Sequence, residues 1–333
     1  MNALILGFTF LLALLLAVTG TPIAKRVAHH YNLLDFPDGR LKKQREPVPY
    51  MGGVIVYFAF ISPISLVFDF NQQLLGILFS SSILVMVGLF DDLKALSPST
   101  KFFFQVIATY ILLKSGIFLH LLFLPPWLAT VLSFFWILSM INAFNIIDIM
   151  DGLASSIGAI STLAIFVIAL GTGDFMIAIL SLSLAAALIG FLKFNWEPAQ
   201  IYLGDTGSML IGLNVGALTI MADYSRFNSW AFVAGLLIPA VPLFDLGYVS
   251  LLRLLSGKSP FLGSPDHFAL RLRKGRGWTS RRTVTVIALL QGVLAVIAVL
   301  VIHFSVTVTL VTCGVVGLFL VAFGAWLARV KMG

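Results

Sequence analysis

The segment from Leu74 to Asp92 reads LLGILFSSSILVMVGLFDD, an unbroken apolar run that ends in two adjacent aspartates. Residues 74–90 carry no charge, and a helix needs roughly 20 mainly apolar residues to cross a bilayer. The segment is therefore predicted to be a membrane-spanning helix with a polar end in water. Similar apolar runs recur along the rest of the chain.

Composition indicates that the bilayer is the solvent for the whole chain. Of its 333 residues, 59% are hydrophobic and 11% are charged, whereas soluble domains carry about 25% charged residues. We predict an all-α, polytopic membrane protein, with one integral membrane domain over residues 1–333 and about 11 transmembrane helices. The candidate spans are 1–24, 50–68, 74–90, 101–119, 122–141, 152–171, 174–192, 207–222, 229–254, 283–302 and 305–328.

The first span is interpreted as a retained anchor, because no basic residue precedes it and no small-x-small cleavage site follows. With the N-terminus outside, alternating loops place 19 of the 21 Lys and Arg residues on one side, and only Lys114 and Arg226 on the other. The positive-inside rule makes the first side cytoplasmic. The net charge of +7 then reflects topology and contact with anionic lipid or phosphate, and does not indicate nucleic-acid binding.

Asp91 and Asp92 lie at the C-terminal end of an inward-running helix, where the helix dipole disfavours anions. They are expected to need a cation, either a metal ion or a lysine such as Lys94 or Lys101. A solvated loop is the alternative interpretation. A second polar group contains Asn145, Asp148 and Asp151, whose spacing of three places them on one face if the segment is helical. Here the alternative is that Asp151 caps the next helix.

A third group runs from Phe194 to Ser208 and contains Gly204-Asp205-Thr206-Gly207 at the start of a span. The glycines allow a close backbone approach to a ligand, and a helix N-terminus favours phosphate. A simple helix cap is again the alternative. The loop 255–282 adds many cations, which suit pyrophosphate or an anionic leaflet. The residues considered there are Asp266, His267, Arg271, Arg273, Lys274, Arg276, Arg281 and Arg282.

For Arg273, Lys274 and Arg276 we favour contact with the lipid surface, whereas His267 and Arg271, spaced by four, are expected to face one way together. All these groups fall on one predicted face. The only cysteine, Cys313, lies in the last span, so a cysteine-based metal site is excluded. Oxygen-rich ligands favour Mg²⁺, with Mn²⁺ as the other hard cation. A hard cation, a basic loop and a membrane boundary together predict phosphoryl transfer between a polar and a lipid substrate.

From about residue 35 to 282 these ordered motifs resemble the polyprenyl-phosphate N-acetylhexosamine-1-phosphate transferases, the MraY–WecA–TagO family. The resemblance implies a multi-pass enzyme of a bacterial-type plasma membrane with its active site on the cytoplasmic face, a UDP-activated amino sugar and polyprenyl phosphate as substrates, UMP as product, and Mg²⁺ as cofactor. In the implied reaction the lipid phosphate attacks the β-phosphorus of the UDP-sugar, and Mg²⁺ bridges the pyrophosphate. A homodimer is a further expectation.

The resemblance assigns roles to individual residues. Asp91 and Asp92 match the catalytic aspartate pair, which the family associates with Mg²⁺ and with deprotonating the lipid phosphate. Lys101 matches a phosphate-contacting lysine. Asp205 and Asn145 match the metal ligands.

The remaining matches concern substrate binding. Asp148 and Asp151 resemble aspartates that help to bind the nucleotide-sugar. Asn195 and Tyr202 occupy positions linked to uracil recognition, and Tyr202 has a ring that can stack on the base. Arg45 falls where relatives have a basic nucleotide contact.

Two departures from the family pattern concern substrate binding. Ile149 replaces the usual glycine after Asp148. The loop with His267 and Arg271 lacks the histidine-rich cluster of the muramoyl-pentapeptide enzymes, since Ala269 and Leu270 stand where other histidines are common. This favours a WecA/TagO-like role and leaves the sugar open.

Two other functions were weighed. A transporter or flippase would use acids near the membrane midplane. Asp245 is the acid that lies well inside a predicted span. A CDP-alcohol phosphotransferase would need an Asp-Gly-x-x-Ala-Arg run, and the sequence at Asp151-Gly152-Leu153-Ala154-Ser155-Ser156 lacks that spacing and the arginine.

Overall fold

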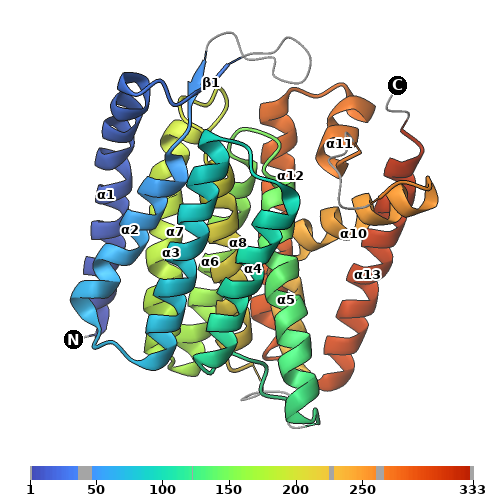
Figure 1. The fold of residues 1–333 in the computed structure, drawn as a ribbon. Helices are drawn as coiled ribbons and strands as arrows, with labels where there is room; N and C mark the ends of the chain where they lie inside the picture. The colour runs from blue at the N-terminus through green and yellow to red at the C-terminus, as the bar shows by residue number, and fades with distance from the viewer. Residues whose placement is uncertain (1, 37–46, 122, 225–228, 260–265, 331–333) are drawn as a thin grey trace.

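The computed structural model describes residues 2–36, 47–121, 123–224, 229–259 and 266–330, which form a bundle of helices (Figure 1). The helices are α1 (Asn2–His30), α2 (Gly52–Val67), α3 (Gln72–Leu93), α4 (Pro98–Lys114), α5 (Pro126–Ile147), α6 (Leu153–Thr172), α7 (Phe175–Asn195), α8 (Gly204–Met221), α9 (Ala234–Leu237), α10 (Ala240–Leu255), α11 (Phe268–Arg276), α12 (Ser280–Val301) and α13 (Val306–Ala328), with a short 3-10 helix at Ala231–Val233. This confirms the predicted polytopic helical fold.

Many helices start at a polar side chain that satisfies a free backbone N–H group, as N-caps do. In α3, for example, the Asn71 side chain accepts a hydrogen bond from the Leu74 N–H at 2.8 Å. The same bond forms at the starts of α4, α7, α12 and α13. The capping residues there are Ser97, Asp174, Thr279 and Ser305. These residues separate one apolar run from the next.

Within the described residues, seven helices are long and apolar enough to cross a membrane: α1, α3, α5, α6, α7, α12 and α13. Residues 231–255 would make an eighth, but the chain bends there by 65° between α9 and α10. The span predicted over 229–254 corresponds to this bent pair, and whether the pair crosses the membrane as one span stays a prediction. Pro239 lies at the break, where proline interrupts helical hydrogen bonding. The helices α2, α4 and α8 do not meet the criterion, so the count of 11 stays a prediction.

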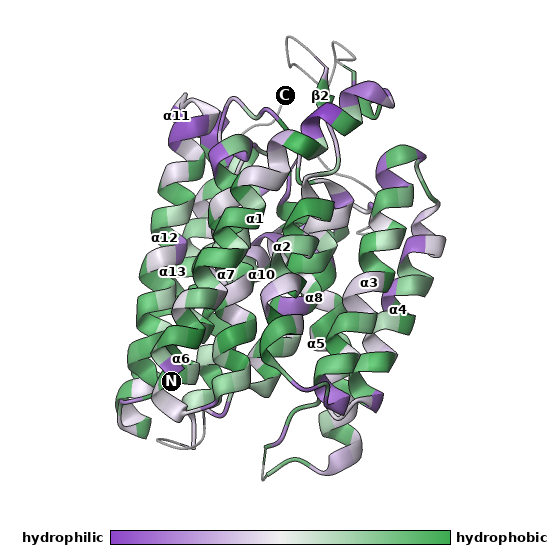
Figure 2. Cartoon of the chain, turned by 90° about the vertical axis from the view of Figure 1, so that its left-hand side faces the viewer, coloured by the Kyte–Doolittle hydropathy of each residue, from purple (hydrophilic) through white to green (hydrophobic). Residues whose placement is uncertain are grey.

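The two ends of the bundle differ in their polarity. Hydrophilic residues gather at the end that holds α11 and β2, while the sides are largely hydrophobic (Figure 2). The helix α1 starts at the opposite end, and α13 ends at the hydrophilic end (Figure 1). The charge distribution predicts this arrangement, with the N-terminus outside and the side rich in Lys and Arg in the cytoplasm. Which end faces the cytoplasm stays a prediction.

The helix α8 occupies the centre of the core, where it packs against α2, α3, α5 and α6. Every residue from Thr206 to Ile220 is buried. Its one buried amide, that of Asn214, donates to the Ser81 hydroxyl of α3 at 3.0 Å, as polar side chains between membrane helices commonly do. The N-terminus of this central helix therefore lies at the hydrophilic end, with the ends of several other helices around it.

A small antiparallel sheet closes the same end of the bundle. Strand β1 (Leu34–Asp35) pairs with β2 (Val48–Pro49), with Leu34 opposite Pro49. The Pro49 carbonyl accepts the Tyr202 N–H at 2.9 Å, and the Tyr202 carbonyl accepts the Gly52 N–H at 3.1 Å. These bonds attach the loop before α8 to the start of α2.

Candidate functional site

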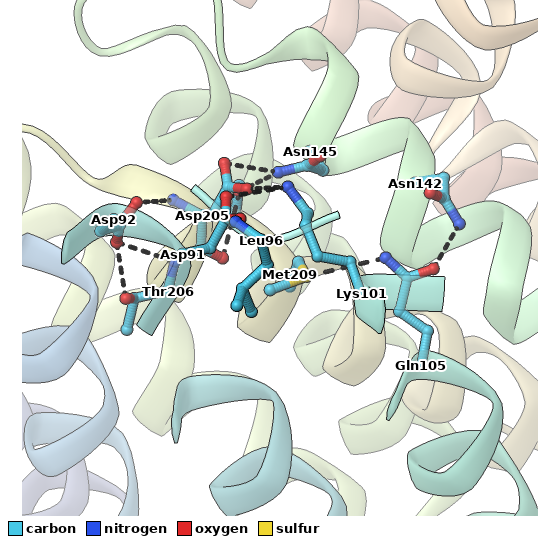
Figure 3. Close-up of polar contacts among 11 residues, drawn as sticks. Asp91, Asp92, Leu96, Lys101, Gln105, Asn142, Asn145, Asp205, Thr206 and Met209 are labelled. Atoms are coloured by element: carbon cyan, nitrogen blue, oxygen red, sulfur yellow. Dashed lines mark hydrogen bonds and ion pairs between the residues drawn. The ribbon is translucent and has the colours of Figure 1, made fainter. Parts of the chain in front are cut away.

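Two carboxylates and one ammonium group meet where α3 ends and where α4 and α8 begin. Lys101 Nζ lies 3.0 Å from Asp91 Oδ2 and also bonds to Asp205 Oδ2 (Figure 3). Each side chain is between 15% and 27% exposed, so substrates in water can reach all three. The structure thus brings together Asp91, Lys101 and Asp205, as the placement of their motifs on one face predicted. Asp91 and Asp205 lie 114 residues apart in the sequence.

Asp91 is placed by the turn that ends α3. Its Oδ1 accepts the N–H of Leu96 at 2.7 Å, which closes the turn leading to α4. Lys101 then projects from the first turn of α4, whose N-cap is Ser97. The lysine supplies the cation that the unfavourable helix end was expected to need, so the alternative of a merely solvated loop is wrong for Asp91.

Asp92 is compensated differently, by donors at the start of α8, and a cation at this carboxylate stays a prediction. Its Oδ1 accepts the Asp205 N–H at 2.8 Å, while its Oδ2 accepts the Thr206 N–H at 3.2 Å and the Thr206 hydroxyl at 2.7 Å (Figure 3). The carboxylate therefore caps the N-terminus of α8, where both the free N–H groups and the helix dipole stabilise an anion.

Glycines make this capping contact possible. Gly204 has φ of +71°, and a Cβ atom there would lie 2.4 Å from the Asp92 carboxylate. A Cβ atom on Gly88 of α3 would lie 2.4 Å from Thr206 Cα. The glycines around Asp205 were expected to let a ligand approach the backbone. In the structure, the close approach at Gly204 is used by Asp92.

Asn145 reaches the centre from the last turn of α5. Its Nδ2 donates to Asp205 Oδ1 at 2.9 Å and to the Ser208 hydroxyl at 3.0 Å. As a metal ligand it would instead have to present its amide oxygen. One turn earlier, Asn142 donates to Gln105 of α4 at 2.9 Å (Figure 3).

Asp148 and Asp151 do not share a helix face with Asn145, because α5 ends at Ile147. Burial raises the pKa of Asp148 well above its usual range, and the carboxylates of Asp205 and Asp92 raise it further. Asp151 accepts the Ala199 N–H at 2.8 Å, and burial raises its pKa. It does not cap α6, whose N-cap is Gly152, so that alternative is also wrong.

Tyr202 is half-buried beside Tyr50, and their ring centroids are 6.2 Å apart. Burial and the nearby Asp151 carboxylate raise the pKa of Tyr202 to about 12, so its ring stays a neutral surface on which a base can stack. Asn195 is only 3% exposed; its amide accepts from Ser155 and donates to the Ile201 carbonyl. The Asn195 amide is thus used to hold the loop before Tyr202. The structure does not support a direct contact between Asn195 and the base.

The side chains of His267 and Arg271 bond to other parts of the protein. The structure therefore does not support the prediction that they face the substrate together. His267 Nδ1 lies 2.8 Å from Asp245 Oδ2 in the protein interior. Arg271 donates to Asp266 at 2.6 Å and to the Val330 carbonyl after α13 at 2.8 Å. The partners were missed because they lie 22 and 59 residues away in the sequence. Arg45 lies outside the described residues.

The donor chemistry of the centre can be compared with the needs of Mg²⁺. Within the described residues, no three His, Cys, Asp or Glu side chains form a ready-made metal cluster. Mg²⁺, however, usually binds through one or two carboxylates together with substrate phosphates and water, and Asp91 and Asp205 offer two. Among the described residues, Lys101 is the one cation bonded to this pair, so the two carboxylates carry one more charge than the lysine offsets. The excess of negative charge fits a divalent cation.

Sequence comparisons agree with this architecture. Residues 74–223 match the model of glycosyl transferase family 4. The chain is 30% identical, over 87% of its length and 83% of the relative's, to the probable undecaprenyl-phosphate N-acetylglucosaminyl 1-phosphate transferase of Bacillus subtilis. It is 31% identical, over 81% of its length and 76% of the relative's, to the decaprenyl-phosphate N-acetylglucosaminephosphotransferase of Mycolicibacterium smegmatis.

A third relative is the undecaprenyl-phosphate alpha-N-acetylglucosaminyl 1-phosphate transferase of Escherichia coli K12, which is 28% identical over 83% of this chain and 78% of its own. The matched region begins in α3 and ends just after α8. It therefore includes Asp91, Lys101, Asn145 and Asp205, the residues that meet in the centre. The identity across most of both chains shows that this protein is a member of glycosyl transferase family 4.

Proposed function

We propose that this protein transfers N-acetylglucosamine 1-phosphate from its UDP-activated form to polyprenyl phosphate and releases UMP. The reaction would take place at the cytoplasmic face of a bacterial-type plasma membrane. The observation that carries the proposal is the convergence of Asp91, Lys101 and Asp205 at the hydrophilic end of the helix bundle. The relatives' names support the sugar and the lipid.

In the proposed step, an oxygen of the lipid phosphate attacks the β-phosphorus of the UDP-sugar. The new bond joins the two phosphates, the bond from the β-phosphorus to the UMP oxygen breaks, and UMP leaves. Lys101 is suited to bind the lipid phosphate, because a lysine is a compact point charge for phosphate. Asp91, thereby released from Lys101, is suited to take the proton of that phosphate. Asp92 is a positioning residue, because its carboxylate is already committed to α8.

Mg²⁺ is the proposed cofactor, with Mn²⁺ as the other candidate. Asp205 would hold it, with Asn145 if its amide presents the oxygen, and Asp91 would stay available for the proton. When bound, it would neutralise charge on the pyrophosphate during phosphoryl transfer. Tyr202 supplies a half-buried ring beside this centre for the uracil, and Asp151 positions the intervening loop through its bond to Ala199.

The transporter alternative is weaker. It depended on Asp245 as an intramembrane acid, but the Asp245 carboxylate bonds to His267 at 2.8 Å and to the Phe268 N–H at 2.9 Å. That carboxylate fastens α11 to α10, and a cation relay would require it to be free.

The proposal is tested by incubating the purified protein with polyprenyl phosphate and one UDP-sugar at a time, comparing N-acetylglucosamine with N-acetylgalactosamine and glucose. UMP is measured by chromatography and the lipid product by mass spectrometry. We expect equal amounts of UMP and lipid-linked N-acetylglucosamine phosphate. Asp91→Asn should be inactive, whereas Asp69→Asn, whose exposed side chain lies before α3, should match the wild type. UMP release that does not depend on the lipid would contradict the proposal.

A further inference from the structure

An open cavity of about 360 Å³ lies between α11, α12 and α13. Its walls are almost entirely apolar and include Leu290 of α12 and Phe319, Phe323 and Trp326 of α13. None of its lining residues belongs to the carboxylate centre. A ligand in this cavity would therefore not be presented to Asp91.

One wall of the cavity is an aromatic ladder along α13. The rings of Phe319 and Phe323 stack at 6.0 Å, and those of Phe323 and Trp326 stack at 6.0 Å. The three positions are spaced by four and three, so they lie on one helical face. Phe319 is 49% exposed although it lines a cavity. An apolar surface of this kind in a membrane protein is suited to a hydrocarbon chain.

Two arginines lie beside aromatic residues that line the cavity. The Arg276 guanidinium lines the cavity and lies 4.8 Å from the Trp326 ring centroid. The Arg282 guanidinium lies 4.9 Å from the ring centroid of Trp278, which is another lining residue. In the part of the chain that the structure describes, neither arginine has a carboxylate partner. Tryptophan is enriched where membrane meets water, so the pairs indicate the depth at which lipid head groups lie.

The segment that contains both arginines is strongly basic. Residues 268–282 contain six Lys and Arg side chains and no acid. Arg271 is neutralised by Asp266, and Arg273 donates to the Ser280 hydroxyl. The helix α11 is hydrophilic (Figure 2), and its Arg276 lines the apolar cavity. Basic pockets between membrane helices on the cytoplasmic side bind anionic head groups.

We propose that this cavity is a binding site for an anionic glycerophospholipid, distinct from the substrate site. One acyl chain lies along Leu290 and the Phe319–Trp326 ladder, and the phosphate binds to Arg276 and Arg282. Arginine is suited to this role because its planar guanidinium binds phosphate oxygens in a bidentate manner and stacks on aromatic rings. The sequence already favoured lipid contact for Arg276, and the structure adds the cavity for the chain.

The test measures lipid selectivity by tryptophan quenching in vesicles of neutral phosphatidylcholine. Either phosphatidylglycerol or phosphatidylcholine with brominated acyl chains is added at the same mole fraction, and the full-length protein is used. Both lipids quench through general contact. We expect additional quenching by brominated phosphatidylglycerol, and we expect Trp326→Phe to remove most of that difference.

Two variants separate the cavity from general surface charge. Arg276→Gln should lower the relative affinity for phosphatidylglycerol about fivefold, the effect of one basic residue at an anionic membrane surface. Arg281→Gln is the matched control, because Arg281 is exposed, lies next to Arg282 and is not a lining residue. It should keep the selectivity. Leu290→Phe, which fills the cavity without changing charge, should abolish the additional quenching. Thermal unfolding confirms that each variant is folded.

Three results would overturn the proposal. The first is equal quenching by the two brominated lipids in the wild type. The second is an equal loss of selectivity in Arg276→Gln and Arg281→Gln, which would indicate only surface charge. The third is displacement of brominated phosphatidylglycerol by one equivalent of polyprenyl phosphate, which would assign the cavity to the lipid substrate. None of these measurements depends on enzymatic activity, so failure here is distinguishable from failure of the proposed reaction.

Discussion

Replacing Asp92 by Asn should reduce stability as well as activity, whereas Asp91→Asn should reduce activity alone. The Asp92 carboxylate accepts three hydrogen bonds from the first turn of α8. An Asn side chain keeps one acceptor oxygen and places an NH₂ group opposite backbone N–H donors. At least one charge-assisted bond is then lost, and each such bond contributes about 1.5–3 kcal/mol. The favourable interaction of an anion with the helix N-terminus, about 0.3–1 kcal/mol, is lost as well. Together these two contributions are about 2–4 kcal/mol, and the desolvation cost of the partly buried Asp92 carboxylate, which Asn avoids, offsets part of them.

Thermal unfolding of purified wild type and both variants in the same detergent measures this difference, with UMP release measured in parallel. Asp91→Asn keeps an oxygen that can accept the Leu96 N–H, and it removes one of two carboxylates from Lys101. We therefore expect its unfolding temperature to stay near that of the wild type while UMP release is lost. Equal unfolding temperatures for Asp92→Asn and the wild type would refute the capping argument. Full activity in Asp92→Asn would show that α8 does not need this cap to position Asp205.

Lys101→Met should reduce UMP release at least about 100-fold, the usual effect of removing one group that stabilises transition-state charge, and near-normal release would exclude a phosphate-binding role. Asp148→Asn should raise the unfolding temperature at neutral pH. Because the pKa of Asp148 is raised in the folded state, the folded protein loses stability as pH rises from the ordinary carboxyl range through that raised pKa. The increase in unfolding temperature should therefore shrink in acid, and an increase that does not depend on pH would contradict this argument. Tyr202→Ala should raise the KM for the UDP-sugar, since stacking contributes roughly 1–3 kcal/mol per base, and an unchanged KM would place the uracil elsewhere. In a cysteine-free background, cysteines at Lys274 and Asp69 should react with impermeant reagents from opposite sides of the membrane, and labelling from one side would overturn the topology.

The sequence predicted the fold well because span length and charge placement are local properties. Each predicted span corresponds to a helix or to the bent pair, and Asp91, Lys101 and Asp205 meet as their placement on one face implied. What failed depends on where a helix stops. The spacing of Asn145, Asp148 and Asp151 suits a helix, but α5 ends at Ile147.

Long-range partners were also beyond sequence reasoning. The dipole argument correctly identified an unfavourable helix end at Asp92, but the sequence does not say what compensates it. The answer is the N-terminus of α8, 113 residues away. The pairing of Asp245 with His267 was hidden for the same reason, because each residue was noted in its own segment but the two lie 22 residues apart. In both cases the deciding contact depends on tertiary packing.

Asp91, Asp92, Asp148 and Asp205 lie near one another but in different local environments. This difference bears on the proposed metal. Asp92 is stabilised by backbone N–H groups, and Asp91 and Asp205 share one lysine. Burial and the neighbouring carboxylates raise the pKa of Asp148, which favours its neutral form. A pyrophosphate entering here would add negative charge and would compete with both aspartates for Lys101. Lys101 already bonds to both Asp91 and Asp205, so a pyrophosphate entering here favours a second cation. This argument supports Mg²⁺ at Asp205 without relying on the resemblance to known enzymes.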